Sequence, residues 1–236
     1  MGLKLKLAMA AGCRRGFFML SQSLDLNKLS IHNVLERKIF SYSSRLGESI
    51  LDDILKLSQL INSHDVITFR HSLNVALFSN WLANEARLPQ KEVARITIAG
   101  FLHDIGKTNI PTAVLNKPGR LDETEWELIK KHPQGGVFIL SGYTWSYDLL
   151  SIIGYHHERV DGSGYYGLSG EDIPLGAKII CIADAFDAMF SLRSYQQIKP
   201  VPDCCMELEK NSDSQFDGEL VNRFIRVTKK VSVFRR

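Results

Sequence analysis

The chain has 236 residues, of which 44% are hydrophobic and 23% are charged, so it can bury the core of a soluble globular domain. Its formal net charge of +3 is too small to indicate a nucleic acid polymer as a partner. The four cysteines, Cys13, Cys181, Cys204 and Cys205, show no CxxC spacing, which argues against a disulfide framework. These totals favour a cytoplasmic protein.

The N-terminal stretch combines a basic start with a short apolar run that ends at Cys13. An export signal is one interpretation, but the run is short and Arg14 and Arg15 interrupt it. No other segment is apolar for long enough to predict a membrane span. We expect residues 1–45 to form a poorly defined N-terminal extension and residues 46–236 to form one domain.

From Leu46 onward, apolar residues recur at spacings of three and four, which is the period of an α-helix. In "LDETEWELIKKHP", Asp122 and Glu125 have the spacing of a capping box, and Pro133 is expected to stop the helix and leave His132 at its end. No run alternates as a half-buried strand would, so the pattern predicts an all-α bundle. The expected helices cover residues 46–60, 71–88, 90–106, 122–132, 147–157, 175–190, 201–210 and 217–230, and a glycine-rich loop covers residues 160–174.

Five of the seven histidines lie at the expected starts or ends of helices. A helix bundle can hold metal ions between facing helices by directing imidazoles and carboxylates inward. A lone histidine needs no such explanation, and we interpret His32 and His64 as ordinary core or surface groups. The candidate metal ligands are therefore His71, His103, His132, His156 and His157.

Two aspartates extend this candidate site. Asp104 directly follows His103, and a carboxylate can bridge two cations through its two oxygens. Lys107, three residues later, could direct its ammonium at the same centre. Asp184 lies among apolar residues, where an unpaired carboxylate would be costly to bury. A metal ligand would explain Asp184, and an ion pair with a buried Lys or Arg is the alternative.

Two long motifs, "HDIGKTNIPTAVLNKPGRLDETEWELIKKHP" and "HHERVDGSGYYGLSGEDIPLGAKIICIADAFDAM", resemble the HD-GYP family of bacterial metal-dependent phosphodiesterases that degrade cyclic di-GMP. The resemblance extends from about Thr68 to Phe224, with several motifs in the family's order and spacing. It implies an HD-domain-like helical bundle with the metal site between helices. Residues 46–236 would then form an HD-GYP-like phosphodiesterase domain.

The resemblance also implies a set of roles. Two divalent metal ions, iron or manganese with zinc as an alternative, would be bridged by Asp104, and Lys107 would contact the scissile phosphate. Asp104 and Lys107 would thus be the catalytic residues. Gly164 and Tyr165 would belong to the family's name-giving triplet and would contact substrate together with Arg193. The implied metal ligands are His71, His103, Asp104, His132, His156, His157 and Asp184.

Three positions depart from the family's pattern. Tyr166 stands where the triplet has proline, which is expected to loosen the loop. Ile67 stands where trinuclear members have a Glu ligand, so the resemblance implies two ions rather than three. Gln196 stands where a basic residue is common, which would remove one phosphate contact.

The implied reaction is hydrolysis of cyclic di-GMP to linear pGpG, with further hydrolysis to GMP left open, by a water activated between two metal ions. One alternative is an HD-type phosphohydrolase that acts on cyclic GMP-AMP or a nucleotide monoester. Another is a docking module that holds metal and dinucleotide with little turnover. The resemblance further implies a diguanylate cyclase (GGDEF) domain as a partner at the loop Gly164–Tyr166.

Overall fold

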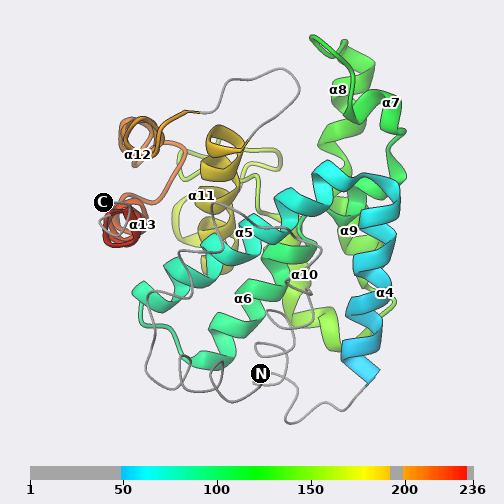
Figure 1. Ribbon diagram of the computed structural model, residues 1–236, viewed down its shortest axis with the longest axis horizontal. Coiled ribbons are helices and arrows are strands. Elements are labelled where there is room, and N and C mark those ends of the chain that lie inside the picture. Colours follow the sequence, from blue (N-terminus) through cyan, green and yellow to red (C-terminus); the bar gives the residue numbers. More distant parts are fainter. Residues whose placement is uncertain (1–48, 192–198, 233–236) are drawn as a thin grey trace, which may run out of the picture.

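The structure is a computed structural model that describes residues 49–191 and 199–232. The expected N-terminal extension and the substrate-contact candidate Arg193, with Gln196, lie outside the described residues. Within those ranges the chain forms helices and irregular connections and no strand, so the predicted all-α class is confirmed (Figure 1).

The helices follow one another with short connections. The α-helices of the described residues are α4 (Ser49–His64), α5 (Val66–Glu85), α6 (Gln90–Leu102), α7 (Thr112–Leu115), α8 (Glu123–Lys130), α9 (His132–Leu140), α10 (Tyr147–Gly154), α11 (Leu175–Phe190), α12 (Val201–Lys210) and α13 (Gly218–Ser232). The 3-10 helices are η1 (Ile105–Asn109), η2 (Thr144–Ser146) and η3 (Gly170–Asp172).

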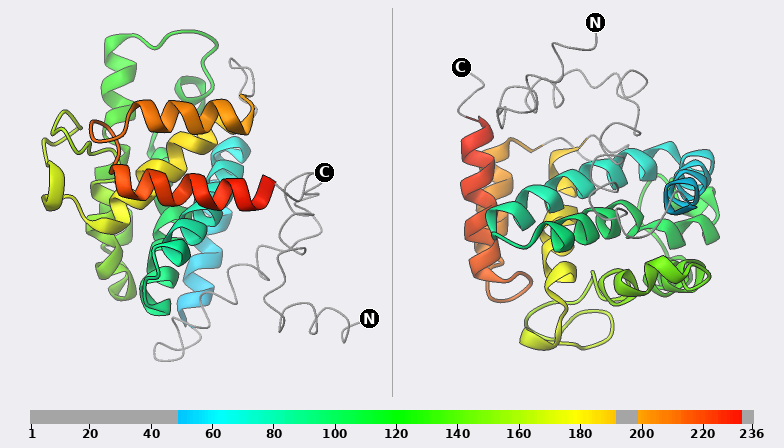
Figure 2. Two further views of the ribbon diagram at one scale, coloured as in Figure 1. Left: turned by 90° about the vertical axis from the view of Figure 1, so that its left-hand side faces the viewer. Right: turned by 90° about the horizontal axis from the view of Figure 1, so that it is seen from below.

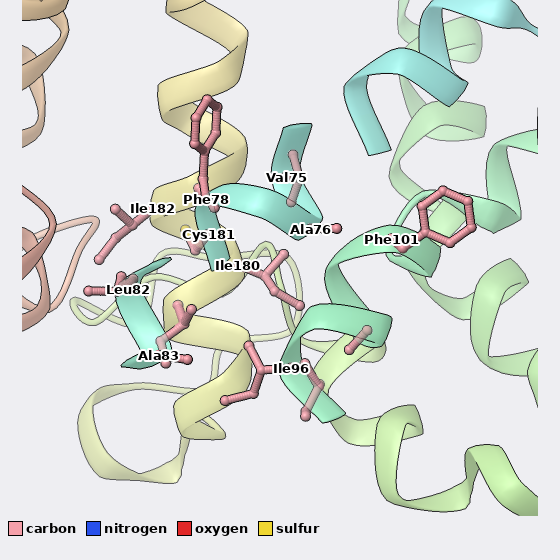
Figure 3. Close-up of a cluster of buried hydrophobic side chains, with 14 of the residues drawn as sticks. Val75, Ala76, Phe78, Leu82, Ala83, Ile96, Phe101, Ile180, Cys181 and Ile182 are labelled. Atoms are coloured by element: carbon pink, nitrogen blue, oxygen red, sulfur yellow. The ribbon is translucent and has the colours of Figure 1, made fainter. Parts of the chain in front are cut away.

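Helices α5, α6 and α11 form the centre of the molecule. Figure 3 shows their buried apolar side chains, among them Phe78 of α5, Ile96 of α6 and Ile180 of α11. The ring of Phe78 packs edge-on against Phe186 of α11, with centroids 5.1 Å apart. Burial of each such side chain contributes about 1.5–3 kcal/mol. This core holds α5 and α11 against each other, and both helices carry candidate metal ligands.

Further helices flank this centre on two sides (Figures 1 and 2). On one side lie α12 and α13, and Phe224 of α13 packs against Phe186 with ring centroids 5.0 Å apart. On the other side lies α4, where His64 Nε2 is 2.9 Å from the Ile110 carbonyl oxygen. This contact joins the end of α4 to the chain after η1, which is a structural role for His64.

Two helix boundaries near the candidate ligands differ from the predictions. Helix α5 begins at Val66 rather than at His71, because Asp65 Oδ2 accepts the backbone N–H of Thr68 at 2.7 Å and caps the helix. His71 therefore lies in the second turn of α5 and not at its start. Helix α6 ends at Leu102 rather than at Gly106, and His103 and Asp104 form a turn before η1 begins at Ile105.

The prediction that Pro133 ends a helix was wrong. The expected capping box of Asp122 and Glu125 does begin α8, but α8 ends at Lys130 and α9 starts at His132. Pro133 occupies the first turn of α9, where a residue without an N–H loses no helical hydrogen bond. Helix α10 ends at Gly154 rather than His157.

No helix in the described ranges is both long enough and apolar enough to cross a membrane. Cys181, Cys204 and Cys205 are buried free thiols.

Candidate metal centre

The structure brings together all seven side chains that the sequence suggests as metal ligands. They come from four parts of the bundle: α5, the end of α6, the region from the start of α9 to the turn after α10, and α11. We call His71, His103, Asp104 and Asp184 the first cluster, and His132, His156 and His157 the second cluster.

In the first cluster, donor atoms face one another across short distances. His71 Nε2 lies 3.0 Å from Asp184 Oδ1 and 3.6 Å from Asp104 Oδ2. His103 Nε2 lies 3.4 Å from the same Asp104 oxygen. His71, His103 and Asp104 each offer a donor atom within 4.8 Å of the other two, as metal ligands must. Asp184 has its close partner in His71, and among the described residues no Lys or Arg forms the alternative ion pair with it.

The second cluster consists of three imidazoles whose donor atoms also lie within 4.8 Å of one another. His132 begins α9, while His156 and His157 lie in the turn after α10. His132 Nε2 and His156 Nε2 are only 3.2 Å apart.

Asp104 joins the two clusters. Its Oδ2 faces His71 and His103, whereas its Oδ1 lies 3.1 Å from His132 Nε2. The two oxygens of one carboxylate thus point to different sets of imidazoles. This is the arrangement by which a carboxylate can bridge two cations.

Four of the imidazoles are oriented by a hydrogen bond at Nδ1. His103 donates to the Gly100 carbonyl oxygen at 2.8 Å, His132 to that of Ile129 at 2.6 Å and His156 to that of Ile153 at 2.6 Å. His71 donates to Asp187 Oδ2 at 2.6 Å. A hydrogen on Nδ1 leaves the lone pair of a neutral ring on Nε2, which is the nitrogen that faces the centre in each case.

These tautomers leave polar atoms that protein groups do not satisfy. His103 Nε2 and Asp104 Oδ1 are buried and have no hydrogen-bond partner with good geometry among the described residues. The Nε2 atoms of His132 and His156 would place lone pair against lone pair when both Nδ1 atoms carry hydrogens. A cation between such atoms would satisfy them, so the residues present fit a metal centre.

The protonation states agree with that fit. Burial lowers the pKa of His156 well below its usual value and lowers the pKa of His157 to about 3, so both rings are neutral at pH 7. Burial also lowers the pKa of His103. For Asp104, burial alone would raise the pKa, but His103, Lys107 and His132 together lower it well below the usual range. The centre therefore offers the neutral nitrogens of His156 and His157 together with the ionised carboxylate of Asp104.

The pKa of His71 is shifted in the opposite direction from the pKa values of His103, His156 and His157. Burial by itself would lower the pKa of His71, but the hydrogen bonds and charges of Asp184 and Asp187 raise it to about 9. A metal cation would take the place of that proton on Nε2.

Lys107 lies at the edge of the centre. Its Nζ donates to Asp104 Oδ2 at 2.6 Å, and its side chain is 22% exposed. An ammonium has three N–H donors, so Lys107 can bind Asp104 and still donate to a further oxygen.

The remaining substrate candidates lie beside the second cluster. The ring of Tyr165 packs against His157 with centroids 4.7 Å apart and an interplanar angle of 33°. Gly164 packs on the backbone of Glu158. Ile67 is 44% exposed on α5, one turn before His71.

The family description "HD domain" matches residues 56–220, which is more than half of the chain and includes every residue of both clusters. This chain belongs to the HD domain family. Both clusters therefore lie within an HD domain.

The chain is also similar to named phosphodiesterases and to a protein of known structure. A cyclic di-GMP phosphodiesterase of Thermotoga maritima is 37% identical over 194 residues, which cover 80% of this chain and 53% of that protein. The 3'3'-cGAMP-specific phosphodiesterase 2 of Vibrio cholerae is 36% identical over 75% of this chain and 34% of its own length. The chain therefore spans about half or less of these relatives. An HDG"Y"P protein from Bdellovibrio bacteriovorus shares the fold, with a TM-score of 0.58 and 22% identity over 69% of this chain and 52% of that one.

Sequence reasoning missed Asp187 in this HD domain. Asp187 is 1% exposed and accepts hydrogen bonds from His71 Nδ1 at 2.6 Å, from Asn74 Nδ2 at 2.8 Å and from Ser191 Oγ at 2.5 Å. Its signal in the sequence was its spacing of three from Asp184, which places both carboxylates on one face of α11. Glu158, which is 2% exposed, was missed as well.

Proposed function

We propose that this HD domain is a metal-dependent phosphodiesterase that hydrolyses cyclic di-GMP to pGpG, with onward hydrolysis to GMP left open. The observation that carries the proposal is the position of Asp104, whose two oxygens face two separate clusters of donor atoms. The resemblance to HD-GYP enzymes and the names of the relatives supply the substrate class.

We propose two sets of metal ligands that share Asp104. His71, His103, Asp104 and Asp184 would hold one divalent ion, and Asp104 with His132, His156 and His157 would hold the other. Nitrogen and oxygen donors without cysteine suit iron or manganese, and they also accept zinc. When bound, two such ions lower the pKa of a shared water and neutralise charge on a phosphate.

The side chains around the ions would bind and orient the substrate. Lys107 would donate to a non-bridging phosphate oxygen while it keeps its hydrogen bond to Asp104, and this contact would strengthen as charge develops. Gly164, Tyr165 and Arg193 would contact the dinucleotide. We further propose the loop Gly164–Tyr166 as the surface that meets a diguanylate cyclase (GGDEF) domain.

A second candidate substrate is 3'3'-cGAMP, because a relative of nearly equal identity is named for it. The test loads the purified chain with Mn²⁺ or, under anaerobic conditions, with Fe²⁺, and compares rates on cyclic di-GMP, 3'3'-cGAMP and pGpG. We expect the highest kcat/KM on cyclic di-GMP. Faster hydrolysis of 3'3'-cGAMP would assign the other substrate, and tight binding without turnover would make the chain a docking module.

Lys107 provides a matched test of the mechanism. Lys107→Met should lower kcat on the order of 10²- to 10³-fold, as loss of a donor to developing charge does, with metal content unchanged. Lys130→Met is the control, because the half-buried Lys130 lies on α8 outside both clusters and pairs with Glu127. Equal activity of the two variants would remove Lys107 from the mechanism.

A further inference from the structure

Glu158 is a buried carboxylate that belongs to neither cluster. It directly follows His157 and is 2% exposed. Its Oε1 accepts the backbone N–H of Tyr166 at 2.7 Å, and its Oε2 accepts that of Leu168 at 2.8 Å. No Lys or Arg of the described ranges forms an ion pair with Glu158. Because a buried charge is costly unless hydrogen bonds satisfy it, these two N–H groups are what keeps Glu158 in place.

The two hydrogen bonds fold the glycine-rich loop back over the chain that carries His157. At Gly164 the approach is so close that an added Cβ would lie 2.6 Å from Glu158 Cα and 2.8 Å from the Arg159 nitrogen. Tyr165 is the next residue in the chain, and its ring packs on the ring of His157 with centroids 4.7 Å apart. Glu158 therefore contacts the loop on both sides of Tyr165, because its backbone lies against Gly164 and its carboxylate binds the N–H groups of Tyr166 and Leu168.

Tyr166 contributes a contact that the related triplet with proline could not make. Proline has no backbone N–H, whereas the N–H of Tyr166 is one of the two donors to Glu158. The Tyr166 ring also packs edge-on against Tyr155, with centroids 6.1 Å apart. These contacts oppose the loosening that the loss of proline was expected to cause.

We infer that Glu158 is a positioning residue: through the N–H groups of Tyr166 and Leu168 it fixes the glycine-rich loop so that Tyr165 is held against His157 at the edge of the metal centre. The inference rests on the proposed function only in its consequence for substrate binding. Glu158 would act through the loop and not by direct contact with a metal or the substrate.

The first test is amide hydrogen exchange on the full chain loaded with Mn²⁺. In Glu158→Gln the side chain keeps its size, but its NH₂ group cannot accept, so one N–H loses its partner. We expect exchange at Tyr166 or Leu168 to speed up at least about tenfold, the effect of losing one hydrogen bond to a charged group. Glu171→Gln, at an exposed carboxylate of the same loop, is the matched control and should leave both amides unchanged.

The second test separates positioning from a general structural role. Glu158→Gln should keep two Mn²⁺ per chain and its kcat on cyclic di-GMP, while KM rises roughly tenfold as one charged hydrogen bond is lost. Tyr166→Pro removes one of the two donors, so its effect on the Leu168 amide and on KM should be non-additive with that of Glu158→Gln.

Unchanged exchange at both amides in Glu158→Gln, or a loss of Mn²⁺ from that variant, would overturn the inference. Strict additivity with Tyr166→Pro would do the same. If the wild-type chain hydrolyses no dinucleotide, the proposed function fails, but the exchange rates and Mn²⁺ content still decide whether Glu158 holds the loop.

Discussion

Asp187 offers a quantitative test of how the bundle orients His71, a proposed metal ligand. Its carboxylate only accepts: Oδ2 takes the His71 Nδ1 hydrogen, and Oδ1 takes hydrogens from Asn74 and Ser191. In Asp187→Asn an NH₂ group replaces one of these two oxygens. If it faces His71, the ring moves its hydrogen to Nε2 and loses the lone pair that faces Asp104 and Asp184. If the new NH₂ group faces Asn74, it meets the NH₂ group of Asn74, and neither group can accept a hydrogen bond.

Either outcome removes a charged hydrogen bond, which is worth about 1.5–3 kcal/mol. Loss of such a partner typically weakens metal affinity 10- to 100-fold, and this matches about 1.4–2.7 kcal/mol. Because only the first cluster contains His71, we expect the Mn²⁺ affinity of one binding step to fall and that of the other step to remain unchanged.

The assay is Mn²⁺ titration followed by electron paramagnetic resonance, with Asp148→Asn as control, since Asp148 is exposed on α10. Two unchanged binding steps in Asp187→Asn would show that Asp187 does not orient His71 for metal binding. Equal weakening of both steps would also contradict that role, because it would indicate a general loss of structure.

Two further predictions concern stability. Asp65→Ala should lower the unfolding free energy by about 1 kcal/mol, measured by urea denaturation, since the cap on Thr68 is lost. Burial by itself would raise the pKa of Asp65, but the hydrogen bonds with Thr68 lower this pKa on balance. The stability difference between wild type and Asp65→Ala should therefore be present above pH 3.8 and shrink as the pH falls. A difference that grows in acid would contradict this. Gly106→Ala should cost about 1–3 kcal/mol, because a Cβ there would lie 1.9 Å from the His132 carbonyl oxygen. Gly142→Ala, with its nearest neighbour at 3.5 Å, should cost far less in the same measurement, and equal costs would contradict the close-packing argument.

The helical class was predictable from the sequence because it leaves a local pattern, whereas the candidate ligands were proposed from their residue types and from the motifs that carry the resemblance. Apolar residues at helical spacing mark the buried faces of α5 and α11. The start of α5 was missed because Val66 and Ile67 are exposed and lie outside the apolar stripe. The cap that begins the helix is instead the Asp65 and Thr68 pair.

Helix α9 was missed for a different reason. Its sequence contains Pro133, Gly135 and Gly136, residues that normally argue against a helix. Here the glycines allow close packing, because Gly106 of η1 lies directly against the first turn of α9 and against Gly136. Tertiary packing of this kind has no signature at the level of local propensity. Asp187 and Glu158 were missed because a carboxylate that orients another group is recognised only through its partner, and the spacing of Asp187 from Asp184 does not reveal that partner.

The proposed function depends above all on Asp104 joining two metal ions. A crystal structure of the chain grown with Mn²⁺, with anomalous difference density measured near the manganese edge, tests it most directly. We expect two peaks on either side of the Asp104 carboxylate, about 3.5–4 Å apart, one next to His71 and His103 and the other next to His132, His156 and His157. A single peak, or peaks that do not contact Asp104, would contradict it.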